Sequence, residues 1–104
     1  MAITTHLLGY PRIGAQRELK FALENFWQKS QDANQLQTVA AQLRAENWQQ
    51  QAGLTWQTVG DFALYDHVLT LTQALGNIPA RFSHLSGLNQ YFALARGEAN
   101  APGL

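Results

Sequence analysis

The sequence of 104 residues contains no cysteine, and this absence excludes two kinds of structure. Without thiols the chain can form neither a disulfide framework nor a thiolate zinc site. It has three histidines, at His6, His67 and His84, and none of them stands at the spacing of a metal-binding pair. We therefore expect no metal site made within this chain.

Charge is also scarce in this sequence. Charged residues make up 13% of it, against a usual share of roughly 25%, and seven basic residues balance seven acidic ones. A nucleic-acid surface needs a basic patch that displaces counterions, and the few Lys and Arg are scattered. Long apolar runs are missing too, so we see no signal peptide and no membrane span, and we expect a soluble cytoplasmic protein.

Apolar residues make up 46% of the sequence, which is enough for the core of one small domain. In four stretches they recur at steps of three and four, which predicts amphipathic helices. Asp32, with Gln35 three positions later, has the form of a capping box at the start of the second helix, and Gly53 is expected to end it. The four expected helices span about residues 16–29, 33–53, 65–75 and 88–96.

Two other stretches favour strands, at residues 3–8 and 55–62. The expected order is strand, helix, helix, strand, helix, helix, and neighbouring strands with such long crossovers are parallel. Two strands cannot bury both faces of a sheet, and a closed (β/α)8 barrel needs about 250 residues. We therefore predict an α/β fold class, as the helix-rich opening of a larger domain, with residues 98–104 as a loop or frayed tail.

A glycine-bounded loop, residues 9–14, joins the first expected strand to the first expected helix. That helix opens with Arg17 and Lys20, which share a face. Cations have the wrong sign for a helix N-terminus, where acidic residues are favoured by up to about 1 kcal/mol each. The two cations either bind an anion there or belong to an ordinary solvated face with Glu18 between them, and spacing alone leaves both open.

The two glycines of this loop form a G-x-x-x-x-G pattern, as in a phosphate-binding P-loop. That motif requires Lys and then Ser or Thr directly afterwards. Ala15 and Gln16 stand there instead, so we reject a nucleotide site.

A second polar cluster follows the second expected strand. It consists of Asp61, Tyr65, Asp66 and His67. In α/β barrels the active face lies at the carboxyl ends of the strands, so this cluster and the loop of residues 9–14 are expected to meet there. The alternatives are that Asp61 caps the next helix or pairs with Arg12, and that His67 is structural on a helix that also buries Val68.

Four blocks of the sequence carry a resemblance to a known family. They read LLGYPRIGAQRELK, VGDFALYDHVL, LGNIPARF and YFALARG. In order and spacing they resemble the N-terminus of the cobalamin-independent methionine synthases, which are 5-methyltetrahydropteroyltriglutamate–homocysteine methyltransferases. The match covers nearly the whole chain, and it is poorest in the Gln-rich second helix and in residues 83–89.

The resemblance implies a fold, a substrate and a cofactor. Family members have two (β/α)8 barrels, and residues 1–97 would begin the N-terminal one. The C-terminal barrel holds the zinc that activates homocysteine, through ligands outside this chain. The resemblance also implies that the segment Arg17, Glu18, Leu19 and Lys20 contacts the tail of 5-methyltetrahydropteroyltri-L-glutamate. That tail is a run of carboxylates, which suits the two cations.

The resemblance further implies that this chain is an N-terminal fragment, since family members are several times longer. A second lysine for the folate tail would fall beyond Leu104. We expect the fragment to be inactive alone, with the rest of the polypeptide as its partner, and to self-associate or be marginally stable. Two alternatives stay open: a non-catalytic anion- or folate-binding paralogue, and a small helical interaction module.

Overall fold

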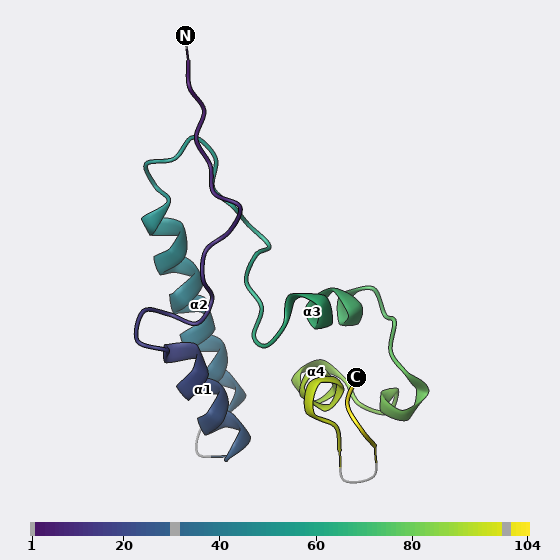
Figure 1. Cartoon of the computed structure of the whole chain (residues 1–104). Helices are drawn as coiled ribbons and strands as arrows, with labels where there is room; N and C mark the ends of the chain where they lie inside the picture. The colour runs from purple at the N-terminus through teal and green to yellow at the C-terminus, as the bar shows by residue number, and fades with distance from the viewer. Residues whose placement is uncertain (1, 30–31, 99–100) are drawn as a thin grey trace. The chain divides into compact units, whose positions relative to one another are not determined.

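The computed structural model describes residues 2–29, 32–98 and 101–104. In these ranges the regular elements are four α-helices and one short 3-10 helix (Figure 1). The chain divides into two compact units, Met1–Leu64 and Tyr65–Leu104, which are described separately below. The elements are α1 (Glu18–Trp27), α2 (Ala33–Gln50), α3 (His67–Ala74), η1 (Ala80–Phe82) and α4 (Gly87–Arg96).

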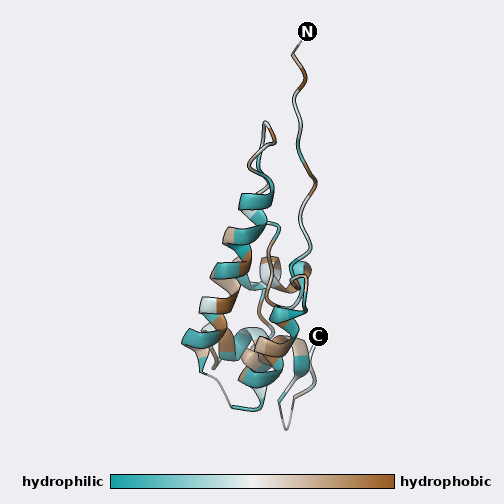
Figure 2. Ribbon diagram, turned by 90° about the vertical axis from the view of Figure 1, so that its left-hand side faces the viewer, coloured by the Kyte–Doolittle hydropathy of each residue, from teal (hydrophilic) through white to brown (hydrophobic). Residues whose placement is uncertain are grey.

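A helical hairpin forms the body of the first unit, with α1 and α2 packed against each other (Figure 1). Each helix buries apolar residues that recur at steps of one turn, as the sequence pattern predicts. Outside these positions α2 is mostly hydrophilic (Figure 2). The buried residues are Leu19, Ala22 and Leu23 of α1 and Leu36, Ala40 and Leu43 of α2.

The predicted capping box of α2 is confirmed. The Asp32 carboxylate accepts a hydrogen bond from the Gln35 backbone N–H at 2.9 Å, and the Gln35 side chain accepts one from the Asp32 N–H at 2.8 Å. Both bonds satisfy backbone donors that have no partner within the helix. The start of α2 is therefore fixed by local sequence.

The bounds of the first two helices differ from the expected ones at their ends. Arg17 and Lys29 flank α1 with left-handed backbones, at φ 62° and φ 61°, and this conformation shortens the helix on both sides. The expectation for Gly53 is wrong, because α2 already ends at Gln50 and Gly53 has no positive φ.

Helix α3 corrects two expectations about the second unit. Asp66 precedes the helix as its N-cap, with the carboxylate accepting from the Leu69 N–H at 2.8 Å. Val68 was expected to be buried, but it is 73% exposed. The buried residue of α3 is Leu69.

The two expected strands are wrong for the described residues, which contain no strand. Residues 3–8 and 55–58 run extended without a backbone ladder, and the side chains of Ile3, Leu8 and Val59 are 81%, 96% and 73% exposed. A ladder needs paired neighbours, and two lone segments of this length make only a marginal pair in water. The chain described here is helical, and any barrel is incomplete in it.

The two extended segments nevertheless lie beside each other in a parallel sense. The Trp56 N–H donates to the Thr5 carbonyl at 3.0 Å, and the Thr5 N–H donates to the Thr55 hydroxyl at 3.0 Å. Further along, the Thr58 hydroxyl donates to the Leu7 carbonyl. Partners advance together along both segments, so the predicted direction is present although most of these bonds use side chains.

Gln51 holds the end of α2 to the second extended segment. Its side chain is 1% exposed, its amide donates to the Asn47 carbonyl at 3.2 Å, and its amide oxygen accepts from the Thr58 N–H at 3.0 Å. A buried amide is tolerated because both of its ends are paired. This glutamine therefore connects local helix structure to a distant segment.

The second unit packs α3 and η1 against α4. Its core contains Phe82 of η1, which is fully buried, and four consecutive residues of α4, Tyr91 to Leu94. Residues 101–104 form a loop tied back to this unit, because the Leu104 N–H donates to the Leu94 carbonyl at 2.8 Å and Arg81 donates to the Pro102 carbonyl at 3.1 Å. The domain boundary at residue 97 stays a prediction.

The Tyr91 hydroxyl organises the start of α3. It accepts hydrogen bonds from the backbone N–H groups of Tyr65 at 3.0 Å and Asp66 at 3.2 Å, and it lies 3.0 Å from the Thr70 hydroxyl. Tyr91 is only 4% exposed, so water cannot easily replace it. One phenol therefore satisfies two donors that precede a helix.

None of the helices in the described ranges is long and apolar enough to cross a membrane.

We expect Tyr91→Phe to lower the free energy of unfolding by about 1 kcal/mol, because two part-buried N–H groups lose their acceptor. Urea unfolding followed by circular dichroism measures this. Tyr10→Phe is the matched control, since no hydrogen bond of its hydroxyl is recorded among the described residues, and it should change stability by less than about 0.5 kcal/mol. Equal effects of the two substitutions would contradict this role of Tyr91.

We expect Gln51→Leu to destabilise the first unit by about 1–3 kcal/mol, although it keeps the size of the side chain, because the Thr58 N–H is left without an acceptor. The same substitution at the exposed Gln49 is the control. Amide hydrogen exchange provides a local measurement: protection at Thr58 should fall in the Gln51 variant only.

Candidate functional site

The loop of residues 9–14 is anchored by Asp61, which follows the second extended segment. The Asp61 carboxylate oxygen Oδ2 accepts a hydrogen bond from the Tyr10 N–H at 2.8 Å. A Cβ atom added at Gly9 would lie 3.3 Å from the same oxygen, so the backbone approaches Asp61 closely. The expected contact with the loop is present for Asp61, and for Tyr65, Asp66 and His67 it stays a prediction. The alternative that Asp61 caps the next helix is wrong, because Asp66 caps α3.

Two further side chains hold the middle of the loop. The Arg12 guanidinium donates to the Leu64 carbonyl at 3.0 Å, so its recorded partner is a backbone oxygen rather than the Asp61 carboxylate. The Asn47 amide of α2 donates to the Pro11 carbonyl at 3.3 Å. Sequence reasoning missed Asn47, because nothing in its local pattern separates it from the other polar residues of α2.

Arg17 stands at the junction of the loop and α1. It is the N-cap residue of the helix rather than part of its first turn, and its side chain is exposed. Its left-handed backbone costs a non-glycine residue about 1–3 kcal/mol, and such conformations cluster at functional sites. Bonds on both sides hold it there: the Arg17 N–H donates to the Gly14 carbonyl and the Arg17 carbonyl accepts from the Phe21 N–H, both at 3.2 Å.

Glu18 is the first residue of α1, and its carboxylate turns back over the loop. One oxygen, Oε1, accepts from the Gln16 N–H at 3.1 Å. The other, Oε2, is buried without a hydrogen-bond partner among the described residues. A Cβ atom added at Gly14 would lie 1.8 Å from Oε2, so the carboxylate fills the space that the glycine leaves.

Leu19 and Lys20 face opposite environments. The Leu19 side chain is fully buried in the core, and its N–H donates to the Ile13 carbonyl at 3.0 Å. The Lys20 side chain is about half exposed, with its ammonium 3.7 Å from the Glu24 carboxylate. An exposed pair of this kind contributes at most about 1 kcal/mol, so a ligand anion can compete for the ammonium.

The first turn of α1 also offers backbone donors. Within the described ranges no partner is recorded for the N–H groups of Glu18 and Lys20, and no side chain caps the helix. Free N–H groups and the helix dipole both favour an anion at this end. The arrangement can therefore bind carboxylates from the solvent side, with Arg17 and Lys20 as the charged groups.

The other residues singled out in the sequence have separate surroundings. Tyr65 and Asp66 lie at the Tyr91 hydroxyl, and His67 is an exposed first residue of α3. His84 lies 3.5 Å from the Glu98 carboxylate, and His6 is exposed. In the part of the chain that the structure describes, no three His, Cys, Asp or Glu side chains gather closely enough to hold a metal ion.

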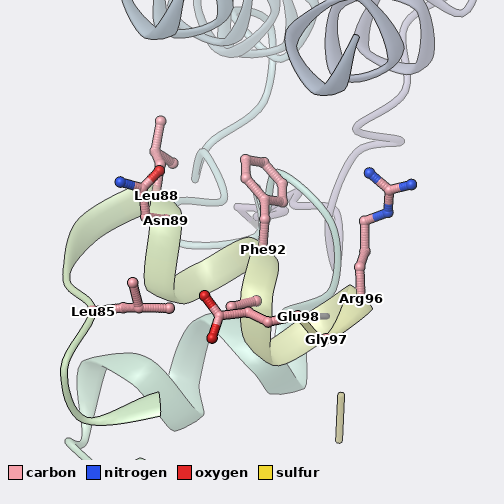
Figure 3. A pocket seen from close by; sticks show the side chains of 8 residues that line it. Leu85, Leu88, Asn89, Phe92, Arg96, Gly97 and Glu98 are labelled. Atoms are coloured by element: carbon pink, nitrogen blue, oxygen red, sulfur yellow. The ribbon is translucent and has the colours of Figure 1, made fainter. Parts of the chain in front are cut away.

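Two hollows occur away from residues 17–20. One, of about 520 Å³, lies between the loop and α2 and is lined by Tyr10, Pro11 and Gly14 among others. The second belongs to the other unit, has a volume of about 570 Å³ and surrounds the end of α4, where the side chains of Phe92, Arg96 and Glu98 line it (Figure 3). Neither is lined by Arg17 or Lys20, which lie at an open helix end.

Comparison with known proteins identifies the family. Residues 4–104 match the family model described as cobalamin-independent synthase, N-terminal domain. Proteins named 5-methyltetrahydropteroyltriglutamate–homocysteine methyltransferase are similar over nearly the whole chain. The one from Vibrio parahaemolyticus is 54% identical over 106 residues, covering 97% of this chain, and the one from Nitrosomonas europaea is 50% identical over 109 residues, covering all of it.

This chain spans about 14% of the length of each of these two relatives. The matched residues contain all four blocks from which the resemblance was inferred, so that prediction is confirmed. The chain belongs to the cobalamin-independent methionine synthase family, and it represents part of the N-terminal domain.

Proposed function

We propose that this chain is the folate-tail-binding part of an enzyme that transfers a methyl group from 5-methyltetrahydropteroyltri-L-glutamate to L-homocysteine, giving methionine. The relatives are named for that activity. The observation that supports it most is the pair of exposed cations, Arg17 and Lys20, at a helix end whose first N–H groups have no recorded partner among the described residues. A cytoplasmic location, expected from the sequence, is part of the proposal.

The chemistry of the tail matches this helix end. A triglutamate carries several carboxylates along a flexible chain, and each can accept hydrogen bonds from an ammonium, a guanidinium or a backbone N–H. In the proposed site Arg17 and Lys20 contact the carboxylates. Leu19 anchors the segment in the core. The Glu18 carboxylate lies against the loop and accepts a hydrogen bond from the Gln16 N–H.

We also propose that this chain begins a barrel, from the way its two extended segments run side by side. The parallel run of residues 3–8 beside residues 55–58 supports their assignment to the first two strands of an N-terminal (β/α)8 barrel in the whole protein. In such barrels the loops after the strands form the binding face. The loop of residues 9–14 follows the first of these segments, so the proposed tail site belongs to that face.

The zinc of the proposed enzyme has no fitting ligand set within the described residues of this chain. When bound elsewhere in the polypeptide, it would hold homocysteine as a thiolate, the nucleophilic form of the thiol. The role proposed for the residues here is confined to binding and orienting the methyl donor.

We expect this chain alone to produce no methionine, because its described residues form no site for the zinc that would hold the homocysteine thiolate. The assay combines the purified chain, zinc, homocysteine and methylated triglutamyl folate, with a full-length relative as the positive control. Methionine formation above the protein-free blank would contradict the assignment of this chain to donor binding only.

We expect Arg17→Ala and Lys20→Ala, made in the full-length enzyme, to raise KM for triglutamyl folate about tenfold each, since each removes a charge-assisted contact. The tail is remote from the transferred methyl, so kcat should change less than KM. The measurement is the ratio of kcat/KM for triglutamyl and monoglutamyl donors, which should fall in both variants.

Lys29→Ala is the matched control. Lys29 is also an exposed cation with a left-handed backbone, at φ 61°, but it lies at the opposite end of α1. Its substitution should leave the preference for triglutamate unchanged. If Arg17→Ala and Lys20→Ala behave like this control, the two cations are ordinary surface residues.

A further inference from the structure

One oxygen of the Glu18 carboxylate, Oε2, has almost no solvent-accessible surface. The other, Oε1, already accepts a hydrogen bond from the Gln16 N–H at 3.1 Å. Arg17 and Lys20, in contrast, are exposed at the open end of α1. Glu18 therefore differs from Arg17 and Lys20, because its charged group is engaged by the protein itself.

The inward position of Glu18 requires Gly14. With a Cβ atom at Gly14, Oε2 would be at 1.8 Å and the Glu18 carboxyl carbon at 2.9 Å, so the carboxylate would have to leave. Gly14 also has φ +89°, a conformation that side chains rarely adopt. The Glu18 carboxylate can therefore occupy this position only because residue 14 has no side chain.

Arg17 lies within the turn that runs from Gly14 to Glu18. Its N–H donates to the Gly14 carbonyl, and the residue before it, Gln16, donates to Glu18. The left-handed backbone of Arg17 is strained by itself and persists only where its surroundings determine it. The bonds across the turn from Gly14 to Glu18 are the nearest contacts that can do so.

From this geometry we propose that Glu18 is a positioning residue, whose carboxylate, seated against Gly14, fixes the backbone of Arg17 so that its guanidinium faces the glutamate tail. The proposal rests on the proposed function and deepens it, because it gives Glu18 a role through Arg17 and not through contact with the ligand. It also explains how a carboxylate can be part of a site for carboxylates. One of its oxygens is buried, the other already accepts a hydrogen bond from Gln16, and its charge lies at a helix N-terminus, which favours it.

Two substitutions at Glu18 in the full-length enzyme test this proposal, because they should change the preference for triglutamyl over monoglutamyl folate in different ways. Glu18→Ala removes the acceptor for Gln16, and we expect the preference for triglutamyl over monoglutamyl folate to fall about three- to tenfold. Glu18→Gln keeps an acceptor oxygen and removes the negative charge, so the preference should equal or exceed that of the wild type. If Glu18 only repelled the tail, both variants would raise the preference, and that result would overturn the proposal.

A double-mutant cycle with Arg17 separates positioning from direct contact. In the Arg17→Ala background, Glu18→Ala should change the preference no further, because the group that it positions is gone. Independent, multiplicative losses would mean that Glu18 binds the ligand itself, and would overturn the proposal. The proposed function fails by a different result, namely an unchanged preference in Arg17→Ala alone.

Gly14→Ala displaces the Glu18 carboxylate while leaving Glu18 and Arg17 chemically intact, so it should lower the preference as Glu18→Ala does. Gly76→Ala is its control, since Gly76 also has a positive φ, of +73°, but nothing within 4 Å of the added Cβ. KM for homocysteine and kcat with the monoglutamyl donor report folding and should stay within about twofold. A folded Gly14→Ala enzyme with unchanged preference would overturn the proposal, and if this variant does not fold, the Glu18 and Arg17 cycle decides alone.

Discussion

The loop of residues 9–14 depends on the pairing of residues 5–12 with residues 55–64, which are about fifty residues apart in the sequence. Side chains make most of the bonds: the Asp61 carboxylate accepts from Tyr10, and Arg12 donates to the Leu64 carbonyl. In a complete sheet, backbone ladders on both sides would share this task. Here the side chains fix the position of the loop, and the loop in turn fixes where α1 begins.

The sequence predicted those elements whose causes are local. The capping box at Asp32 and Gln35 and the apolar stripes of α1 and α2 are encoded within a few residues, and they were found at the expected places. The strands were not predicted correctly, because strand formation depends on neighbours that are distant in sequence. The roles of Gln51 and Tyr91 escaped for the same reason: each bonds to backbone groups that only the folded chain brings near.

The residues of the candidate site were named from the sequence and stay a prediction, while their geometry could not be predicted. Spacing left Arg17 and Lys20 between an anion site and a solvated face, and the family resemblance favoured the first. Neither could predict that Arg17 is an N-cap residue in a left-handed conformation, or that the Glu18 carboxylate turns inward over Gly14. These features arise from the closing of one turn, where glycine conformation and side-chain volume act together.

A comparison of the two ends of α1 gives the physical reason to assign a ligand to Arg17. Lys29 has nearly the same backbone, but it follows the C-terminus of the helix, where a left-handed residue is common and a cation is favoured by the dipole. Its conformation and its charge therefore both have a local explanation. Arg17 has neither, because a left-handed residue at the N-cap is strained and a cation there opposes the dipole. Glycine would relieve the strain and serine or aspartate would cap the helix. Under the proposed function, the guanidinium of an arginine at this position contacts the anion that occupies the helix end.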